Sequence, residues 1–396
     1  MDKGEFLANK QKLEAAYVGV LKEYLSDVEF MESDFCLVHQ QNCFISPRRD
    51  LDHQRSLWVE ASGNTCCPWS AMARAVQTGG WLDVASLPFM VWCFSVRFYE
   101  PDLILQENVC RFPEQELLAI LNDFSDGVLK DLWTRPFDAE EGTQRCYKMQ
   151  VHSFSPTDLG IPSNRQRQYA SFSLSPWVKI ETGALTFEAI FHRSRRVGPE
   201  VYLNAVPNSV LISEIKSEAK NRGWDGTKVL TQHDALSTGN RGRLESWQCW
   251  ASRGTALRDK NGVWQHRLAL ADVTQNPRFK NRVDVDYMPC LLTHTVLWDL
   301  VTDSMVPVMA HWLAQGFPHP SAVLLSPDIA RSFPFDPSLI EYVSERALPL
   351  SAQRILTGNA MHGSCIGSWF LFNMVGTDTT RIQAHMDSPV ESLSSL

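Results

Sequence analysis

Residues 102–109 read DLILQENV, an apolar run that ends in Glu-Asn-Val. Three consecutive aliphatic side chains bounded by polar residues are typical of a short buried strand. Apolar periodicity predicts a buried helix over 84–98 before this strand and an amphipathic helix over 113–125 after it. Another strand-like run at 56–61 precedes the first helix. Because strands and helices alternate, the sequence predicts an α/β fold with a parallel sheet.

Reactive side chains follow both predicted strands. The run at 56–61 leads into Cys66 and Cys67, and the run at 102–106 leads into Glu107. Open parallel sheets bind ligands at the carboxyl ends of their strands. A buried cysteine is most often a small apolar filler, whereas a thiolate at such a turn is a nucleophile. We therefore expect a thiol and a carboxyl group on one edge of the sheet.

Five short motifs occur in order along the chain. They are Cys-Pro-Trp-Ser within 66–70, Glu-Asn-Val at 107–109, Asn-Arg-Gln-Arg-Gln-Tyr at 164–169, Gly-Phe-Pro at 316–318 and Thr-Gly-Asn-Ala at 357–360. Each motif alone is weak, but their order is specific. Over about 56–375, the series resembles the DNA (cytosine-5) methyltransferases.

The resemblance implies a covalent mechanism on a cytosine in DNA. It identifies Cys66 as the nucleophile that adds to carbon 6, because carbon 5 becomes nucleophilic only after that addition. Glu107 is implied to protonate or hydrogen-bond ring nitrogen 3. Arg165 and Arg167 are implied to hold the base, the loop or a flanking phosphate. The target base must leave the duplex, so base flipping is implied as well.

The cofactor implied by the resemblance is S-adenosylmethionine, with Asn359 and Ala360 near it at the start of a late helix. The family's glycine-rich loop and its acidic residue are found neither before Gly63 nor after Asn359, and Thr65 replaces the usual proline. We therefore expect weak or no methyl transfer by this chain alone. We expect either a truncated or degenerate copy of the family, or a second chain that supplies the missing half. The alternative is a non-catalytic nucleic-acid-binding relative.

Charge is divided unevenly along the chain. Residues 1–150 hold 14 Lys and Arg against 23 Asp and Glu, a net of −9, whereas residues 161–296 hold 19 against 12, a net of +7. A basic segment beside an acidic one is expected where one part contacts phosphates, although a solvated face without a partner fits equally well. The arginines expected to bind nucleic acid are Arg193, Arg195, Arg196, Arg241 and Arg243.

The expected architecture is a Rossmann-like methyltransferase sheet, partial or truncated at its N-terminus, with a smaller mixed-β target-recognition domain. The predicted parts are an N-terminal helix and lead-in at 1–55, a catalytic α/β domain at 56–169 and 287–380, a target-recognition domain at 170–286, and a disordered tail at 381–396. Short β-rich runs such as Val201–Leu203 led to the mixed-β assignment.

Other function classes find less support. Cys36, His39 and Cys43 have metal-ligand spacing but no clear fourth ligand nearby, so no metal is expected. A thiol hydrolase would need a histidine, and the available His39, His152 and His192 lie in no recognisable context. The sequence shows neither a secretory signal nor a run long enough to span a membrane, and its cysteines lack a disulfide spacing. An intracellular protein is expected, nuclear if eukaryotic.

Overall fold

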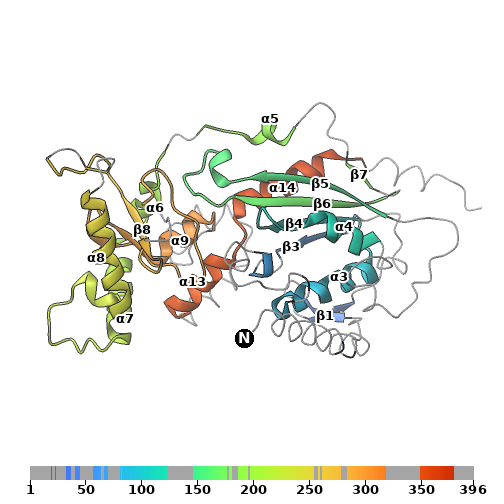
Figure 1. Ribbon diagram of the computed structural model, residues 1–396. Helices are drawn as coiled ribbons and strands as arrows, with labels where there is room; N and C mark the ends of the chain where they lie inside the picture. The colour runs from blue at the N-terminus through green and yellow to red at the C-terminus, as the bar shows by residue number, and fades with distance from the viewer. Residues whose placement is uncertain are drawn as a thin grey trace, which may run out of the picture. The chain divides into compact units, whose positions relative to one another are not determined.

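The computed structural model describes Gly19, Glu23 and the ranges 33–36, 41–44, 57–63, 67–69, 81, 83–122, 146–175, 178–180, 186–194, 197–253, 257–258, 261–277, 283–317 and 348–378. The chain divides into two compact units (Figure 1). Unit 1 comprises Met1–Phe154, Gln166–Phe187 and Trp369–Leu396, and unit 2 comprises Ser155–Arg165 and Glu188–Ser368.

Unit 1 is built on a four-stranded sheet in the order β3-β4-β6-β5. The strands are β3 (Val59–Ser62), β4 (Leu103–Asn108), β5 (Cys146–Phe154) and β6 (Arg167–Ser175). β3 and β4 are parallel, whereas β6 is antiparallel to both β4 and β5. The predicted α/β fold is confirmed, and so is the parallel strand pair. The expectation of a sheet that is parallel throughout is wrong, because β5 and β6 form a hairpin-like antiparallel pair.

Two helices cover one face of this sheet (Figure 1). They are α3 (Leu87–Tyr99) and α4 (Glu114–Asn122), close to the helices predicted at 84–98 and 113–125. Ile104 of β4 and Phe172 of β6 pack with buried side chains of both helices, such as Phe89 and Leu117. Successive residues of a strand point to opposite faces, so the even-numbered residues of β4 face the helices.

The other face of the sheet packs against α14 (Gly363–Gly376), in which the boundary between the units falls. Trp369 of α14 donates a hydrogen bond from Nε1 to the Ala170 carbonyl at 3.3 Å. Its ring lies 5.2 Å from His152 and 5.8 Å from Phe187. A short ribbon of β7 (Lys179–Ile180) and β11 (Thr377–Asp378) follows the same helix.

Unit 2 contains a three-stranded antiparallel sheet in the order β10-β9-β8. The strands are β8 (Leu270–Asp272), β9 (Leu297–Asp299) and β10 (Ser304–Met305). The helices are α5 (Phe187–Phe191), whose first residue belongs to unit 1, α6 (Glu200–Asn204), α7 (Asn208–Asn221), α8 (Thr238–Arg253), α9 (Val308–Ala314) and α13 (Leu350–Asn359). Trp247 of α8 and Trp298 of β9 are fully buried in the core of this unit.

Unit 2 has more helix than the sequence analysis expects. Val201–Leu203 was expected to be a β-rich run, but these residues lie in α6, which follows Pro199. A proline that precedes a helix fixes φ where a helix begins, and this signal outweighs the β-propensity of a short apolar run. Helices α7 and α8 were not predicted.

The boundaries of the units also differ from the predicted domains. Residues 170–175 were placed in the target-recognition domain, but they belong to β6, which hydrogen-bonds to β4 and β5 in unit 1. Residues 287–368 were placed with the catalytic sheet, yet they cluster with unit 2. Sequence reasoning assigned these segments by composition, whereas strand pairing and packing determine the units.

The N-terminal region is described only in part. Gly19 and Glu23 are helical, and β1 (Ser33–Cys36) pairs with β2 (Gln41–Phe44). His39 and most of the predicted helix at 4–28 lie outside the described residues, as does the predicted tail at 381–396. Within the described ranges, no cluster of His, Cys, Asp and Glu could hold a metal ion, and no helix is long and apolar enough to cross a membrane.

Candidate functional site

The carboxyl ends of β3 and β4 lie side by side in unit 1. Ser62, the last residue of β3, pairs with Gln106, so the chain leaves β3 next to Glu107. Trp69 anchors the segment that follows, with its ring 4.9 Å from Trp81 and 4.8 Å from Phe112. Ser62 and Trp69 therefore both lie near the end of β4, since Ser62 pairs with Gln106 and Trp69 packs on Phe112.

The predicted nucleophile Cys66 falls between Ser62 and Trp69 in the sequence but lies outside the described residues. The backbone of Cys67 opens a short helical turn at Cys67–Trp69. The sequence-based expectation that Cys66 faces Glu107 thus stays a prediction.

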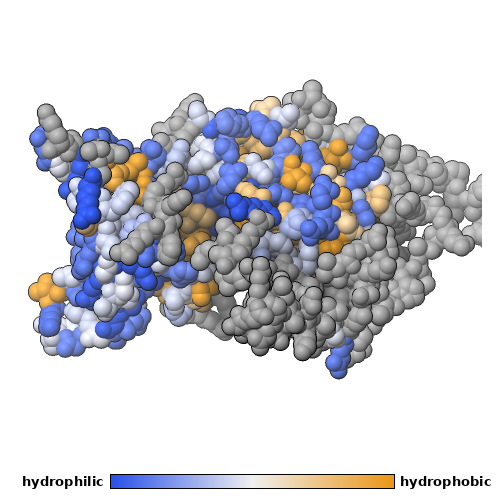
Figure 2. All heavy atoms as spheres, viewed as in Figure 1, coloured by the Kyte–Doolittle hydropathy of each residue, from blue (hydrophilic) through white to orange (hydrophobic). Residues whose placement is uncertain are grey.

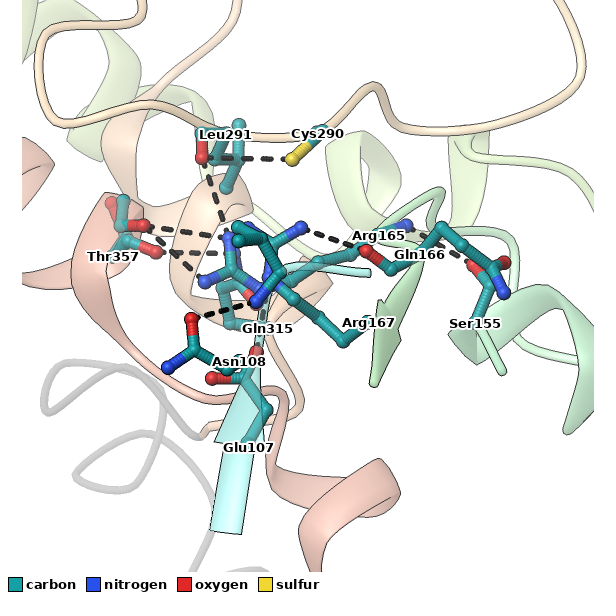
Figure 3. A network of polar contacts seen from close by, with 12 residues as sticks. Glu107, Asn108, Ser155, Arg165, Gln166, Arg167, Cys290, Leu291, Gln315 and Thr357 are labelled. Carbon is teal, nitrogen blue, oxygen red and sulfur yellow. Dashed lines mark hydrogen bonds and ion pairs between the residues drawn. The ribbon is translucent and has the colours of Figure 1, made fainter. Parts of the chain in front are cut away.

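Glu107, which is buried, and Arg167, which is half-buried, form an ion pair that Figure 3 shows from close by. The Arg167 Nε atom lies 3.0 Å from Glu107 Oε1, and the two side chains are 14% and 8% exposed. Glu107 pairs with Tyr169 across β4 and β6, and Arg167 is two residues further along the same strand, on the same face. The sheet register therefore brings together two of the predicted site residues, a carboxyl and a guanidinium group.

Arg165 is held within unit 2, unlike Arg167. Its side chain is buried, and its Nη1 atom lies 3.4 Å from the carbonyl oxygens of both Leu291 and Gly358 (Figure 3). Its backbone N–H donates to Ser155 Oγ at 3.1 Å. Such carbonyl contacts fix the guanidinium in place. The predicted role of Arg165 toward a base, a loop or a phosphate stays a prediction.

Asn359 and Ala360 lie at the end of a helix, and the expectation that they begin one is wrong. Asn359 is the last residue of α13 and is exposed, and Ala360 is its C-cap. The next helix, α14, begins at Gly363. Gly358 explains the local geometry, because a Cβ atom there would lie 2.4 Å from backbone atoms of Leu292 and Thr293. The Thr-Gly-Asn-Ala motif thus serves close packing of α13 on a loop.

The predicted nucleic-acid-binding arginines are partly described. Arg193 is exposed and its Nη1 donates to the carbonyl of His192 at 2.7 Å. Arg241 is exposed and Arg243 is half-buried, both on α8. Arg195 and Arg196 lie outside the described residues. Figure 2 shows mainly hydrophilic residues over the part of the molecule where Figure 1 draws α7 and α8.

Sequence reasoning missed a group of buried polar side chains next to the ion pair. Gln106, Asn108 and Glu114 are 0%, 1% and 4% exposed. Gln106 makes no side-chain hydrogen bond with any residue that the structure describes, and neither does Asn108 through Nδ2. Burial raises the pKa of Glu114 to about 8, which opposes the smaller effect of a hydrogen bond from Gln168. A carboxyl group in the first turn of a helix normally faces water, so the sequence carried no signal of its burial.

Thiols near the site differ in character. Cys93 is fully buried in α3, and burial raises the pKa of its thiol, which makes it an inert core residue. Cys110 is exposed just beyond β4, and burial of part of its surface raises its pKa. Arg167 lowers the pKa of Cys110, whereas Glu107 raises it. Cys110 is therefore an exposed thiol within electrostatic range of the ion pair.

A scan of protein-family models and a search of curated proteins found no match. Solved structures that resemble the chain include the Entamoeba histolytica methyltransferase EhMeth, with 14% identity and a TM-score of 0.40 over 80% of this chain and 77% of that chain. The S. pombe Dnmt2 methyltransferase is 13% identical, with a TM-score of 0.37 over 81% and 82%. A Spodoptera frugiperda DNMT2 mutant is also 13% identical, with a TM-score of 0.34 over 85% and 86%.

Proposed function

We propose that this chain binds DNA and accepts a flipped-out cytosine at the carboxyl ends of β3 and β4, in the manner of a cytosine-5 methyltransferase. The observation that carries the proposal is the Glu107–Arg167 ion pair at the end of β4, beside the end of β3, the strand that precedes Cys66 in the sequence. The ordered motifs quoted above support the same assignment. A buried carboxyl group that keeps a cationic partner suits recognition of a ring nitrogen that gains a proton.

The proposed covalent step balances with these residues alone. The Cys66 thiolate forms a bond to carbon 6, a double bond forms between carbons 4 and 5 in place of that between carbons 5 and 6, and the electron pair of the carbon 4–nitrogen 3 double bond moves to nitrogen 3. Nitrogen 3 takes a proton from Glu107, which enters this step in its protonated form. Glu107 is left as a carboxylate, and Arg167 lies 3.0 Å from it to stabilise that charge. The base becomes an enamine whose carbon 5 is nucleophilic.

S-adenosylmethionine does not fit the described residues. Its methyl transfer would supply the carbon for position 5, but a cofactor of this kind needs a close backbone approach and an acidic partner for its ribose. Asn359 and Ala360 end α13, and the last turn of a helix presents carbonyl oxygens rather than N–H groups. We propose that the chain alone transfers methyl groups weakly or not at all.

The alternative function is non-catalytic: the chain would bind nucleic acid through the same fold without chemical reaction. The mismatch between Asn359, Ala360 and a cofactor site favours it, because base recognition does not need a methyl donor. In both proposals Glu107 recognises the cytosine. Only the catalytic proposal includes addition of the Cys66 thiolate to the base.

Cytosine recognition can be tested by equilibrium binding. A fluorescent duplex carries one cytosine opposite an abasic site, where flipping costs least, and a matched duplex carries thymine there. We expect tighter binding of the cytosine duplex, by about tenfold, the value of one good hydrogen bond to a charged group. Glu107→Gln is expected to lose most of this preference while retaining general affinity. Equal affinity of the wild type for both duplexes would contradict cytosine recognition.

A further inference from the structure

We propose that the solvent-facing side of α8 around Trp250 is a platform on which an unpaired nucleobase stacks, with flanking arginines that hold phosphates of the same strand. The inference deepens the proposed function, on which it rests for the class of partner. It gives unit 2 a preference for nucleic acid that contains an unpaired stretch, through residues other than the Glu107–Arg167 pair.

Trp250 presents its ring to solvent from a fixed position. It is 43% exposed, and it is the only exposed tryptophan among the residues that the structure describes. Its ring contacts that of Trp247 in a T-shaped arrangement, with the centres 5.8 Å apart. Trp247 is fully buried, and its Nε1 donates a hydrogen bond to the Asp272 carbonyl at 3.2 Å. Trp250 is therefore a large aromatic group held at the surface, which suits stacking on a base.

Two arginines lie on the same side of α8 as Trp250. Arg243 comes seven residues before it and Arg253 three residues after it, and both spacings return to one face of a helix. Arg253 is exposed and Arg243 is half-buried. The two positions are about 15 Å apart along the helix axis, with Trp250 between them. Glu245, the only acidic residue of α8, comes five residues before Trp250 and thus lies on another face.

This set of side chains complements a single nucleic-acid strand. Guanidinium groups bind phosphate oxygens, often through two parallel hydrogen bonds. Every base has a face that can stack on an aromatic side chain, but in a duplex the neighbouring base pairs already cover both faces. The helix carries three arginines against one glutamate, so its charge favours a polyanion over a neutral apolar partner.

Trp264 shows the arrangement in which a tryptophan of this unit is already covered. The guanidinium carbon of Arg258 lies 4.1 Å from the centre of the Trp264 ring. Trp264 is half-buried and packs against the core that contains Trp247. Among the described residues, no cation lies over the ring of Trp250 in this way. Trp250 therefore offers a surface for stacking that Trp264 does not.

Equilibrium binding of strands without cytosine tests the proposal. The probes are a fluorescent oligothymidylate of about 20 nucleotides, an abasic strand of the same length and charge, and the duplex of the first strand with oligoadenylate. We expect the wild type to bind oligothymidylate about tenfold more tightly than the abasic strand, because one stacked base contributes on that order. For the duplex, Trp250→Ala is expected to change the affinity little.

Trp250→Ala is expected to remove the preference for oligothymidylate over the abasic strand while the salt dependence of binding stays at the wild-type value, since no phosphate contact is lost. Trp250→Phe keeps an aromatic face and is expected to retain most of the preference. Trp250→Leu keeps apolar bulk without that face and is expected to lose it. Ile212→Ala on α7 is the matched control, because Ile212 is a 53% exposed apolar residue of the same unit.

Arg253→Gln separates the phosphate contact from the stacking. It is expected to weaken binding of the oligothymidylate and abasic strands alike and to lower the salt slope by about 0.7, the value for one contact on a single strand. An oligouridylate strand shows whether the platform accepts RNA as well as DNA, and Trp250→Ala is expected to weaken binding of each strand that it accepts.

A preference for oligothymidylate that survives in both Trp250→Ala and Trp250→Leu would overturn the proposal, and so would an equal loss of affinity for the abasic strand. Glu107→Gln is expected to keep this preference, which separates the platform from cytosine recognition. An effect of Trp250 without any cytosine preference would contradict the proposed function and leave the platform standing. A cytosine preference without any effect of Trp250 would overturn the platform alone.

Discussion

The ion pair of Glu107 and Arg167 is the residue-level feature on which the account depends. Both side chains are largely removed from water, so their charges compensate each other at close range. Removing one member of such a pair leaves the other charge buried without a partner, and that penalty exceeds the value of the pair itself.

Arg167→Gln is expected to lower the free energy of unfolding by about 3 kcal/mol, because Glu107 would then lie buried without its cation. Urea unfolding followed by tryptophan fluorescence measures the change. Arg193→Gln is the matched control, since Arg193 is exposed and its guanidinium donates a hydrogen bond to the neighbouring His192 carbonyl. An equal and small effect of both changes would show that Glu107 does not depend on Arg167 for stability.

At the residue scale, sequence reasoning found the residues whose position follows from a strand end. Glu107 follows the apolar residues of β4, and the change from apolar to polar residues marks the end of a strand in the sequence. The partner of Glu107 could not be chosen between Arg165 and Arg167, because the choice depends on the register of β6 against β4. The burial of Glu114 could not be predicted for a different reason, since it comes from the packing of α4 on the sheet.

At the scale of secondary-structure elements, α13 shows that a motif can be identified correctly while its secondary structure is predicted wrongly. Thr-Gly-Asn-Ala was expected to start a helix, but Gly358 is part of the last turn of α13. Glycine occurs near both ends of helices, so the residue type alone does not give the direction. What fixes it is the contact of Gly358 with Leu292 and Thr293, which no local pattern encodes.

Gly358→Ala is expected to destabilise the protein by about 2 kcal/mol or more, because its Cβ atom would meet backbone atoms at 2.4 Å. Gly242→Ala is the control with the same chemical change: Gly242 lies in α8 and a Cβ atom there meets nothing within 4 Å. That control is expected to stabilise by about 0.5 kcal/mol through helix propensity. Thermal unfolding of both variants checks the difference in sign, and destabilisation by both would contradict the packing argument.

The alternation of strand and helix was predictable because it depends on local sequence patterns, whereas the position of α13 depends on a long-range contact. β4, α3 and α4 each bury apolar residues of their own, and the pattern is visible within each segment. In β6, serines alternate with Phe172 and Leu174, and the place of this strand between β4 and β5 reflects long-range pairing.

At the scale of the whole molecule, the charge asymmetry is the feature that bears on DNA. The basic segment at 161–296 includes α8, where Arg241 is exposed. Phosphate contacts release counterions, so each contact that is lost lowers the salt dependence of binding by about 0.9 in a plot of log affinity against log salt.

Arg241→Glu combined with Arg243→Glu is expected to weaken binding of all DNA sequences alike and to lower the salt slope by about 1 to 2. Fluorescence anisotropy at several salt concentrations measures both quantities. Lys148→Glu, a charge reversal at an exposed position of β5 in unit 1, is expected to leave the slope nearly unchanged. An unchanged slope in the α8 variant would exclude this helix from the DNA-binding surface.

Cys66 and Glu107 are proposed to act together on one cytosine, and the formation of a covalent adduct with Cys66 is the decisive test. The substrate is a duplex in which pyrimidin-2-one replaces one cytosine, because its carbon 6 accepts a thiolate without any methyl donor. We expect a complex that survives denaturation, that mass spectrometry maps to Cys66, and that forms at least about 100-fold more slowly in Glu107→Gln, the usual effect of losing a general acid. Cys67→Ser should form it and Cys66→Ser should not. A DNA-bound protein that forms no adduct, or one that forms it on Cys67, would contradict the account.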